Sequence, residues 1–227
     1  MDPHPPPIDP RAPAPGTRPE LPARQPRPPT SPHSQADVEV ALWNPLRTVD
    51  VVLATPERVA ANVDGKLALG RLAFMFLVCG LVFAIPYSCV LGLEDWWRVT
   101  TLYLGSTLIC LPSLFVFTSY MGTRVSLAQI VVLALMIPAS AALFTLGFAP
   151  ILEFLRLTMG ETSREIGWAS ISKVLLGISL AAGVIQLWRC FLGARQQTNP
   201  ALLALVLVVW HGVFLYVFSR MFSVLGL

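Results

Sequence analysis

The chain has 227 residues, of which 55% are hydrophobic and 13% are charged, and its mean hydropathy is +0.65. A soluble domain of this size carries about a quarter of charged residues, so this composition excludes a soluble globular protein and indicates an integral membrane protein in contact with the lipid bilayer. The net charge of +3 is too small to favour a nucleic-acid partner. Fourteen arginines against two lysines, with abundant alanine and proline, favour a GC-rich bacterial genome and thus the bacterial inner membrane.

Residues 1–36 hold thirteen of the twenty prolines, with interspersed arginines and almost no large apolar residue. Such a segment has too little apolar surface to fold, so we expect a disordered, Pro/Arg-rich tail of polyproline II character. It is not a secretory signal, because no apolar core follows its charges. The pattern Pro19-x-x-Pro22-x-Arg24 is similar to an SH3 ligand. The tail is therefore the predicted contact for a membrane or cytosolic protein of unknown identity, and a solvated tail without a partner is the alternative.

Residues 37–66 are predicted to form short amphipathic helices that precede the membrane domain. Their apolar residues recur at helical spacing and form one stripe: Trp43, Leu46, Val49, Val52 and Leu53. Thr55-Pro56-Glu57 then predicts a new helix start, with Thr as N-cap and Pro in the first turn. Two placements are open for these helices, namely the membrane interface and the cytosolic ends of the protein's own spans.

Residues 67–227 are predicted to be an all-α transmembrane domain. Each of five apolar runs is long enough to cross a bilayer core at about 1.5 Å per residue. The runs cover residues 69–91, 99–121, 125–149, 171–192 and 200–222. The chain is therefore expected to be a polytopic membrane protein with five transmembrane helices.

The third run is predicted to be a kinked central helix, because Pro138 near its middle is followed by small residues that allow close packing. Residues 150–159 are predicted to form a separate interfacial helix that ends at Gly160. In the fourth run, Gly177-x-x-x-Ala181 and Ser179-x-x-x-Gly183 favour close helix contact. That contact lies either within the chain or between copies, so a homo-oligomer is open.

Charges near the ends of the runs predict the orientation. With the N-terminus inside, six basic residues lie on the cytosolic side and five on the other side. The cluster of Arg58, Lys66 and Arg71 flanks the first run, which often dominates. We therefore expect a cytosolic N-terminus and a C-terminus on the far side.

His211 is the candidate functional residue, since no Asp, Glu or Lys lies deep in any run. An intramembrane histidine marks a functional site by default. Alternatively, His211 is a neutral packing residue that is hydrogen-bonded to Gln186, Ser140 or Ser179. No catalytic motif, metal-ligand spacing or cofactor motif occurs, and the four cysteines show no Cys-x-x-Cys pair. The sequence therefore predicts no enzyme, metal or cofactor, and one intramembrane polar site around His211, Gln186 and Ser140.

The arrangement resembles the Yip (Ypt-interacting protein) family, over about residues 42–222. Three stretches carry the resemblance: Ala54-Thr55-Pro56-Glu57-Arg58, Ser126-Leu127-Ala128-Gln129 and Leu146-Gly147-Phe148-Ala149-Pro150. The resemblance implies a cytosolic N-terminal region, five membrane helices and no catalytic residues. The Asp-Leu-Tyr-Gly-Pro motif of the eukaryotic branch is absent from this sequence, so Rab binding is not carried over.

The sequence thus predicts a non-enzymatic membrane organiser or accessory protein that contacts a partner through its tail. Two other functions remain open. One is a small channel or carrier whose path lies between the proline-kinked helices, and the other is an intramembrane enzyme that uses His211.

Overall fold

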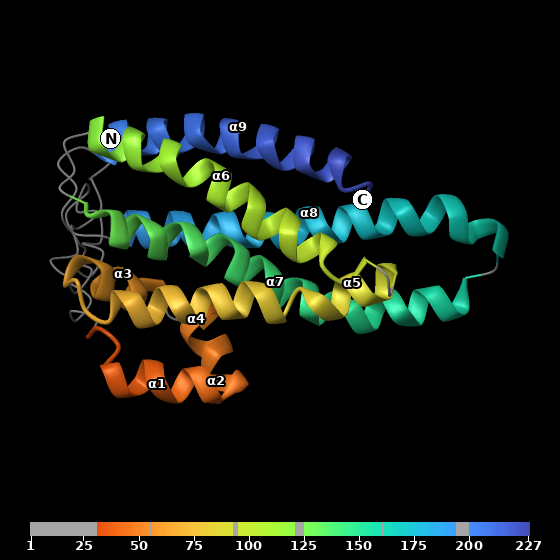
Figure 1. Cartoon of the computed structure of the whole chain (residues 1–227), viewed down its shortest axis with the longest axis horizontal. Helices are drawn as coiled ribbons and strands as arrows, with labels where there is room; N and C mark the ends of the chain where they lie inside the picture. The colour runs from red at the N-terminus through yellow and green to blue at the C-terminus, as the bar shows by residue number, and fades with distance from the viewer. Residues whose placement is uncertain (1–30, 55, 93–94, 121–124, 160, 194–199) are drawn as a thin grey trace, which may run out of the picture.

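The structure is a computed structural model that describes residues 31–54, 56–92, 95–120, 125–159, 161–193 and 200–227. No strand occurs in these ranges, and five helical stretches are long and apolar enough to cross a membrane, which confirms the predicted all-α polytopic fold. Figure 1 shows these stretches running along one long axis. We call the end of the bundle where the first stretch begins the near end, and the end where the chain finishes the far end. Nearly all of the predicted tail lies outside the described residues.

The chain from residue 31 to residue 64, here the N-terminal segment, forms four short helices. They are α1 (Gln35–Trp43), α2 (Pro45–Val49), the π-helix η1 (Asp50–Ala54) and α3 (Pro56–Asp64). Ser34 caps α1 in a reciprocal capping box with Asp37, so this helix begins just inside the predicted tail. The α3 helix begins at Pro56 as predicted, whereas the expected cap Thr55 lies outside the described residues.

The predicted apolar stripe of this segment does not form one face, because the chain turns between α1, α2 and η1. Trp43 and Leu46 are 90% and 80% exposed, whereas Val52 is fully buried. The buried part, which includes Val59 and Val63 of α3, joins the core of the spans. The N-terminal segment is therefore packed on the spans through η1 and α3, and it carries an uncovered apolar surface on α1 and α2.

The first span is interrupted where the sequence suggests one continuous run. It consists of α4 (Leu69–Val82) and α5 (Ile85–Leu91), with Pro86 in the first turn of α5. Proline has no N–H to donate, and its ring collides with the carbonyl four residues earlier. The α4 helix therefore ends at Val82, and α5 begins at Ile85 with Pro86 in its first turn.

The third span, α7 (Leu127–Thr158), passes through both Pro138 and Pro150 as one helix. The prediction of a separate interfacial helix over 150–159 is therefore wrong. Packing holds the last turns in place, since Ala149 is 5% exposed and Leu152 is fully buried. The α7 ribbon changes direction along its length (Figure 1), as expected for a helix with internal prolines.

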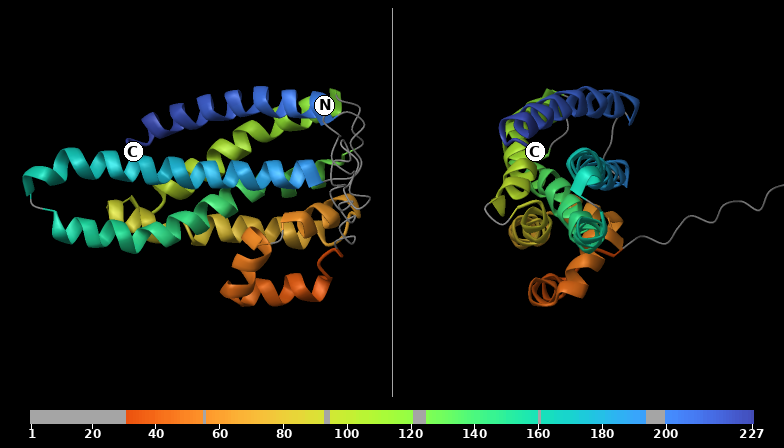
Figure 2. Two further views of the ribbon diagram at one scale, coloured as in Figure 1. Left: turned by 180° about the vertical axis from the view of Figure 1, so that it is seen from behind. Right: turned by 90° about the vertical axis from the view of Figure 1, so that its right-hand side faces the viewer.

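The remaining spans are α6 (Arg98–Tyr120), α8 (Glu161–Gly193) and α9 (Pro200–Val224). The α9 helix begins at Pro200 as predicted, and the expected cap Asn199 lies outside the described residues. Viewed along the long axis, α7 lies in the middle of the bundle, with α9 on one side and α1 on the opposite side (Figure 2).

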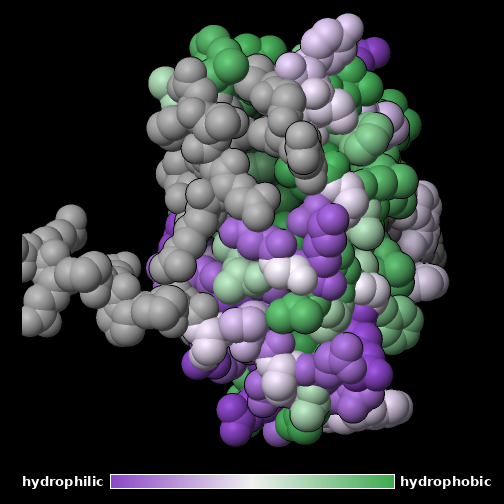
Figure 3. All heavy atoms as spheres, turned by 90° about the vertical axis from the view of Figure 1, so that its left-hand side faces the viewer, coloured by the Kyte–Doolittle hydropathy of each residue, from purple (hydrophilic) through white to green (hydrophobic). Residues whose placement is uncertain are grey.

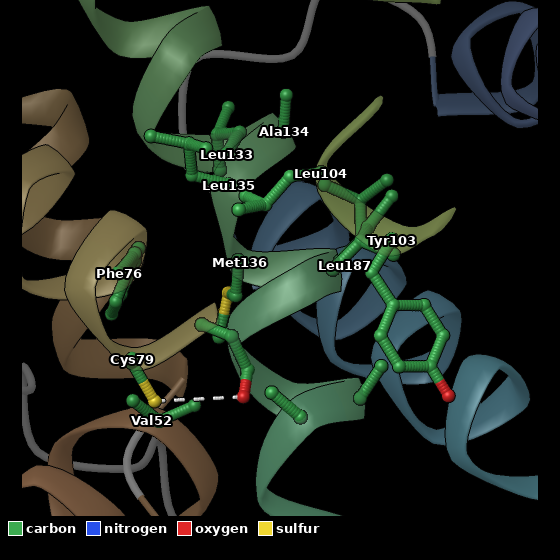
Figure 4. Packing of buried hydrophobic residues seen from close by; sticks show 14 of the residues in the cluster. Val52, Phe76, Cys79, Tyr103, Leu104, Leu133, Ala134, Leu135, Met136 and Leu187 are labelled. Carbon is green, nitrogen blue, oxygen red and sulfur yellow. Dashed lines mark hydrogen bonds between the residues drawn. The ribbon is translucent and has the colours of Figure 1, made fainter. Parts of the chain in front are cut away.

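The α7 helix is the most buried of the five spans, as the sequence predicts for a central helix. Its middle packs against the other spans through apolar side chains, several of which are seen in Figure 4. The backbones of α7 and α8 meet closely: a Cβ atom added to Gly183 would lie 2.6 Å from the Ile137 carbonyl oxygen. Gly177, by contrast, faces open space. Of the two small-residue pairs, Ser179/Gly183 is thus used within the chain, and contact between copies stays a prediction.

Candidate functional site at the near end of the bundle

The three residues of the predicted intramembrane polar site lie on three different spans, and no hydrogen bond joins any two of them within the described ranges. His211 is 8% exposed, and its Nδ1 lies 2.6 Å from the Leu207 carbonyl oxygen of the preceding turn. Because a carbonyl only accepts, Nδ1 carries the proton and Nε2 presents a lone pair that has no hydrogen-bond partner among the described atoms. The Ser140 hydroxyl is buried and is without a described partner too. Ser179 donates to the Leu175 carbonyl oxygen at 2.9 Å.

Aromatic rings surround His211. The Trp210 ring meets it edge-on at 5.1 Å between centroids, and the Trp188 ring is tilted against it at 5.8 Å. The Trp210 indole N–H points to α6, where it lies 3.2 Å from the Cys110 carbonyl oxygen and 3.1 Å from the Ser113 hydroxyl. His211 thus contributes to an aromatic contact among α8 and α9, and a chemical role for it remains a prediction.

Gln186 connects α8 to the N-terminal segment. Its amide Nε2 donates to the Leu53 carbonyl oxygen at 3.1 Å. Leu53 lies in η1, and the wider turn of a π-helix changes which backbone groups pair along the chain. The Gln186 amide therefore satisfies a backbone acceptor that belongs to an irregular helix.

Two further side chains of the spans bond to the backbone of the same segment. The Cys190 thiol on α8 lies 3.1 Å from the Pro56 carbonyl oxygen at the start of α3. The Gln129 amide on α7 donates to the Val63 carbonyl oxygen near the end of α3. Both ends of α3 are thus fixed to different spans, and a longer ion pair joins Arg189 to Glu57 at 3.9 Å.

Asn62 fixes the beginning of the segment. Its side chain is fully buried, and its Oδ1 accepts from the His33 backbone N–H at 2.7 Å while its Nδ2 donates to the His33 carbonyl oxygen at 2.9 Å. The Asn62 side chain thus makes the same pair of hydrogen bonds to the His33 backbone that a neighbouring β-strand would make. Burial and the positive charge of Arg58 lower the pKa of His33, although Asp37 and Asp50 oppose the shift. His33 therefore favours its neutral form while the segment is docked.

The far end has a different character. Two ion pairs lie there, Arg98 with Asp95 at 2.7 Å and Arg156 with Glu153, and the Lys173 ammonium lies 5.5 Å from the centre of the Phe222 ring. Two hollows of about 440 Å³ and 280 Å³ lie between these pairs, and both are lined by Leu91 and Trp168. The residues that the structure describes include no cluster of His, Cys, Asp or Glu that could hold a metal ion.

From the sequence, Gln129 was named only as part of a family resemblance, and Asn62 was not singled out. The signal for Gln129 was present, because Ser126-x-x-Gln129 is a capping-box pattern and the box is formed. No sequence pattern indicates the second hydrogen bond of Gln129, which its side-chain amide donates to the Val63 carbonyl oxygen of α3. Asn62 stands beside the apolar Val59 and Val63, and a polar residue on a buried helical stripe indicates a specific partner.

Comparisons with protein-family models, with curated proteins and with solved structures find no match for this chain.

Proposed function

We propose that the protein is a non-enzymatic membrane organiser whose five spans hold a folded N-terminal segment at one membrane surface and present it, with the tail, to a protein partner. In this proposal the near end is cytosolic and the membrane is the bacterial inner membrane. The docking of the segment carries the proposal: side chains from α7 and α8 bond to the backbone of η1 and α3 at three separate points. The point at which the tail joins this docked segment therefore has a fixed position relative to the membrane.

The composition of the spans supports a structural role. The middle of α7 is buried among apolar side chains, and the polar atoms found there, such as the Ser140 hydroxyl, are single groups rather than a connected chain. Proton-coupled carriers use ionisable groups near the midplane. Five helices after a helical N-terminal segment are also what the resemblance to the Yip family implies.

The test is recovery of the partner from native membranes after chemical cross-linking. The full chain should recover a specific protein, and deletion of residues 1–30 should abolish that recovery while membrane insertion is retained. The Asn62→Leu variant should weaken it, because the root of the tail is then loosened. Equal recovery from all three chains, or from none, would contradict the proposal.

A small channel or carrier is the second candidate, and one observation favours it: buried polar atoms without described partners occur in four spans. They are the Ser106 and Ser140 hydroxyls, Gln186 Oε1 and His211 Nε2. Purified protein in liposomes should show selective solute flux if this function holds. Flux that is lost equally in His211→Gln and His211→Leu, with folding intact, would identify a proton-handling histidine, since neither side chain titrates near neutral pH.

A further inference from the structure

The polarity of α1 changes along its axis rather than around it. Its first half exposes Gln35, Asp37 and Glu39, and its second half leads to Trp43, with Leu46 following in α2. Trp43 and Leu46 are among the most exposed large apolar side chains that the structure describes. We call residues 40–47 the α1–α2 tip. An axial gradient of this kind suits a helix that enters an apolar layer end-on.

The direction of α1 sets the depth of the tip. The α1 helix starts at the near end and runs beside the first half of α4 in the same direction (Figures 1 and 2). An ion pair fixes the register, since Arg71 in the first turn of α4 lies 2.7 Å from Glu39 in the middle of α1. The tip, which follows Glu39, therefore lies further along the first span than Arg71.

Exposed apolar side chains of α4 continue the apolar surface of the tip. Phe74 and Val82, on α4 beyond Arg71, are 57% and 49% exposed, and in a membrane span such side chains face acyl chains. The end face of the bundle, by contrast, gathers hydrophilic residues with hydrophobic residues along its flanks (Figure 3). The tip thus belongs to the apolar flank of the protein, and the hydrophilic end face marks the level of the headgroups.

Several polar groups in and next to the tip are satisfied within the segment, which lowers the cost of placing them in lipid. Asn44 Oδ1 accepts from the Leu46 N–H at 3.1 Å, and the Asn44 N–H donates to the Val40 carbonyl oxygen at 3.1 Å. The Thr48 hydroxyl donates to the Ala41 carbonyl oxygen. Arg47 is the one charged residue of the tip, and its long side chain can extend to the headgroups.

We propose that the α1–α2 tip inserts into the phospholipid leaflet at the near end, with Trp43 and Leu46 among the acyl chains. A hollow of about 620 Å³ between α1 and α4 opens beside the tip toward the same leaflet. Its lining is charged at Glu39 and Arg71 and is otherwise largely apolar: Val40, Leu42, Trp43 and Asn44. Arg71 and Glu39 in this lining pair with each other, and the apolar wall takes part of an acyl chain. This inference does not rest on the proposed function.

The experiment is fluorescence quenching of the full chain in phosphatidylcholine/phosphatidylglycerol vesicles whose acyl chains carry bromine. The difference between the wild type and Trp43→Phe isolates the signal of Trp43. The matched control is Ala36→Trp in the Trp43→Phe background, which places the probe at the exposed, polar start of the same helix. We expect roughly twofold stronger quenching of Trp43 than of the probe at position 36, and the reverse order with water-soluble acrylamide.

Two outcomes would overturn the insertion. Strong acrylamide quenching of Trp43 without bromine quenching would place the tip in water. Protection of Trp43 from both quenchers would mean that protein, either a partner or a second copy, covers it.

Discussion

The polar side chains at the two ends of the bundle make different kinds of contact. At the near end, side chains of the spans bond across to the backbone of residues 31–64. At the far end, charged side chains bond to neighbours three residues away, and hollows remain between the pairs. The near-end contacts join the spans to residues 31–64 and therefore hold a tertiary arrangement, whereas the two far-end ion pairs stabilise local stretches. The far end also has a hydrogen bond between distant residues, from the Tyr87 hydroxyl to the Ser172 carbonyl oxygen at 2.8 Å, but it joins one span to another. The near end is thus the better candidate for a defined surface.

The largest effect is expected where α8 is positioned against α7. Gly183 lies one turn before Gln186, and a methyl group there would collide with the Ile137 backbone. Gly183→Ala should destabilise the protein by about 1–3 kcal/mol and should move Gln186 away from Leu53. Gly177→Ala is the control, because it faces open space and should change stability by less than about 0.5 kcal/mol. Equal melting temperatures of the two variants in detergent would show that α7 and α8 do not meet as described.

Loss of the Asn62 contact comes next. Asn62→Leu removes both hydrogen bonds between the Asn62 side chain and the His33 backbone at a buried site, at a cost of about 1–3 kcal/mol to docking. Trypsin should then cleave faster after Arg58 on α3, while the spans stay intact. Asn62→Asp places a carboxylate opposite the His33 carbonyl oxygen at a buried site, so its cleavage rate should rise at least as much. An unchanged rate in Asn62→Leu would mean that this contact does not hold the segment.

Acidification should loosen the near end and spare the far end. His33 has a lowered pKa in the docked segment, so the released segment binds a proton more readily. Docking is therefore complete above the ordinary histidine pKa of about 6.5 and weakens as the pH falls below it. Pulse proteolysis within residues 31–54, with a protease active across this range, measures the change. His33→Gln should remove the pH dependence, and a variant that keeps it would assign the effect to another group.

The smallest effect is expected at the far end. Arg156 and Glu153 are both more than a third exposed, and water screens such a pair. Glu153→Gln should therefore lower stability by no more than about 0.5 kcal/mol, with a similar value for Arg156→Gln. A loss as large as that of Gly183→Ala would show that the ion pair closes a buried structure, and the contrast between the two ends would fail.

The spans were predictable because length and apolar composition decide whether a helix can cross a bilayer, and both are written in the sequence. Whether a helix continues through a proline was not predictable from the sequence. Pro86 lies in the first turn of a new helix, whereas Pro138 and Pro150 lie inside one helix. Packing by neighbouring spans decides between these outcomes, and it depends on residues far away in the chain. The near-end contacts could not be predicted from the sequence for a related reason. Their acceptors are backbone carbonyl groups, which every residue carries.

Hydrogen exchange of the full chain in lipid vesicles tests the central claim, that the N-terminal segment is a packed part of the membrane domain. Backbone amides of α3, such as those of Ala60 and Val63, should be protected nearly as well as those of α7. Exchange as fast as that of an unstructured peptide throughout α3, with the spans still protected, would contradict the claim and leave five spans with a free juxtamembrane linker.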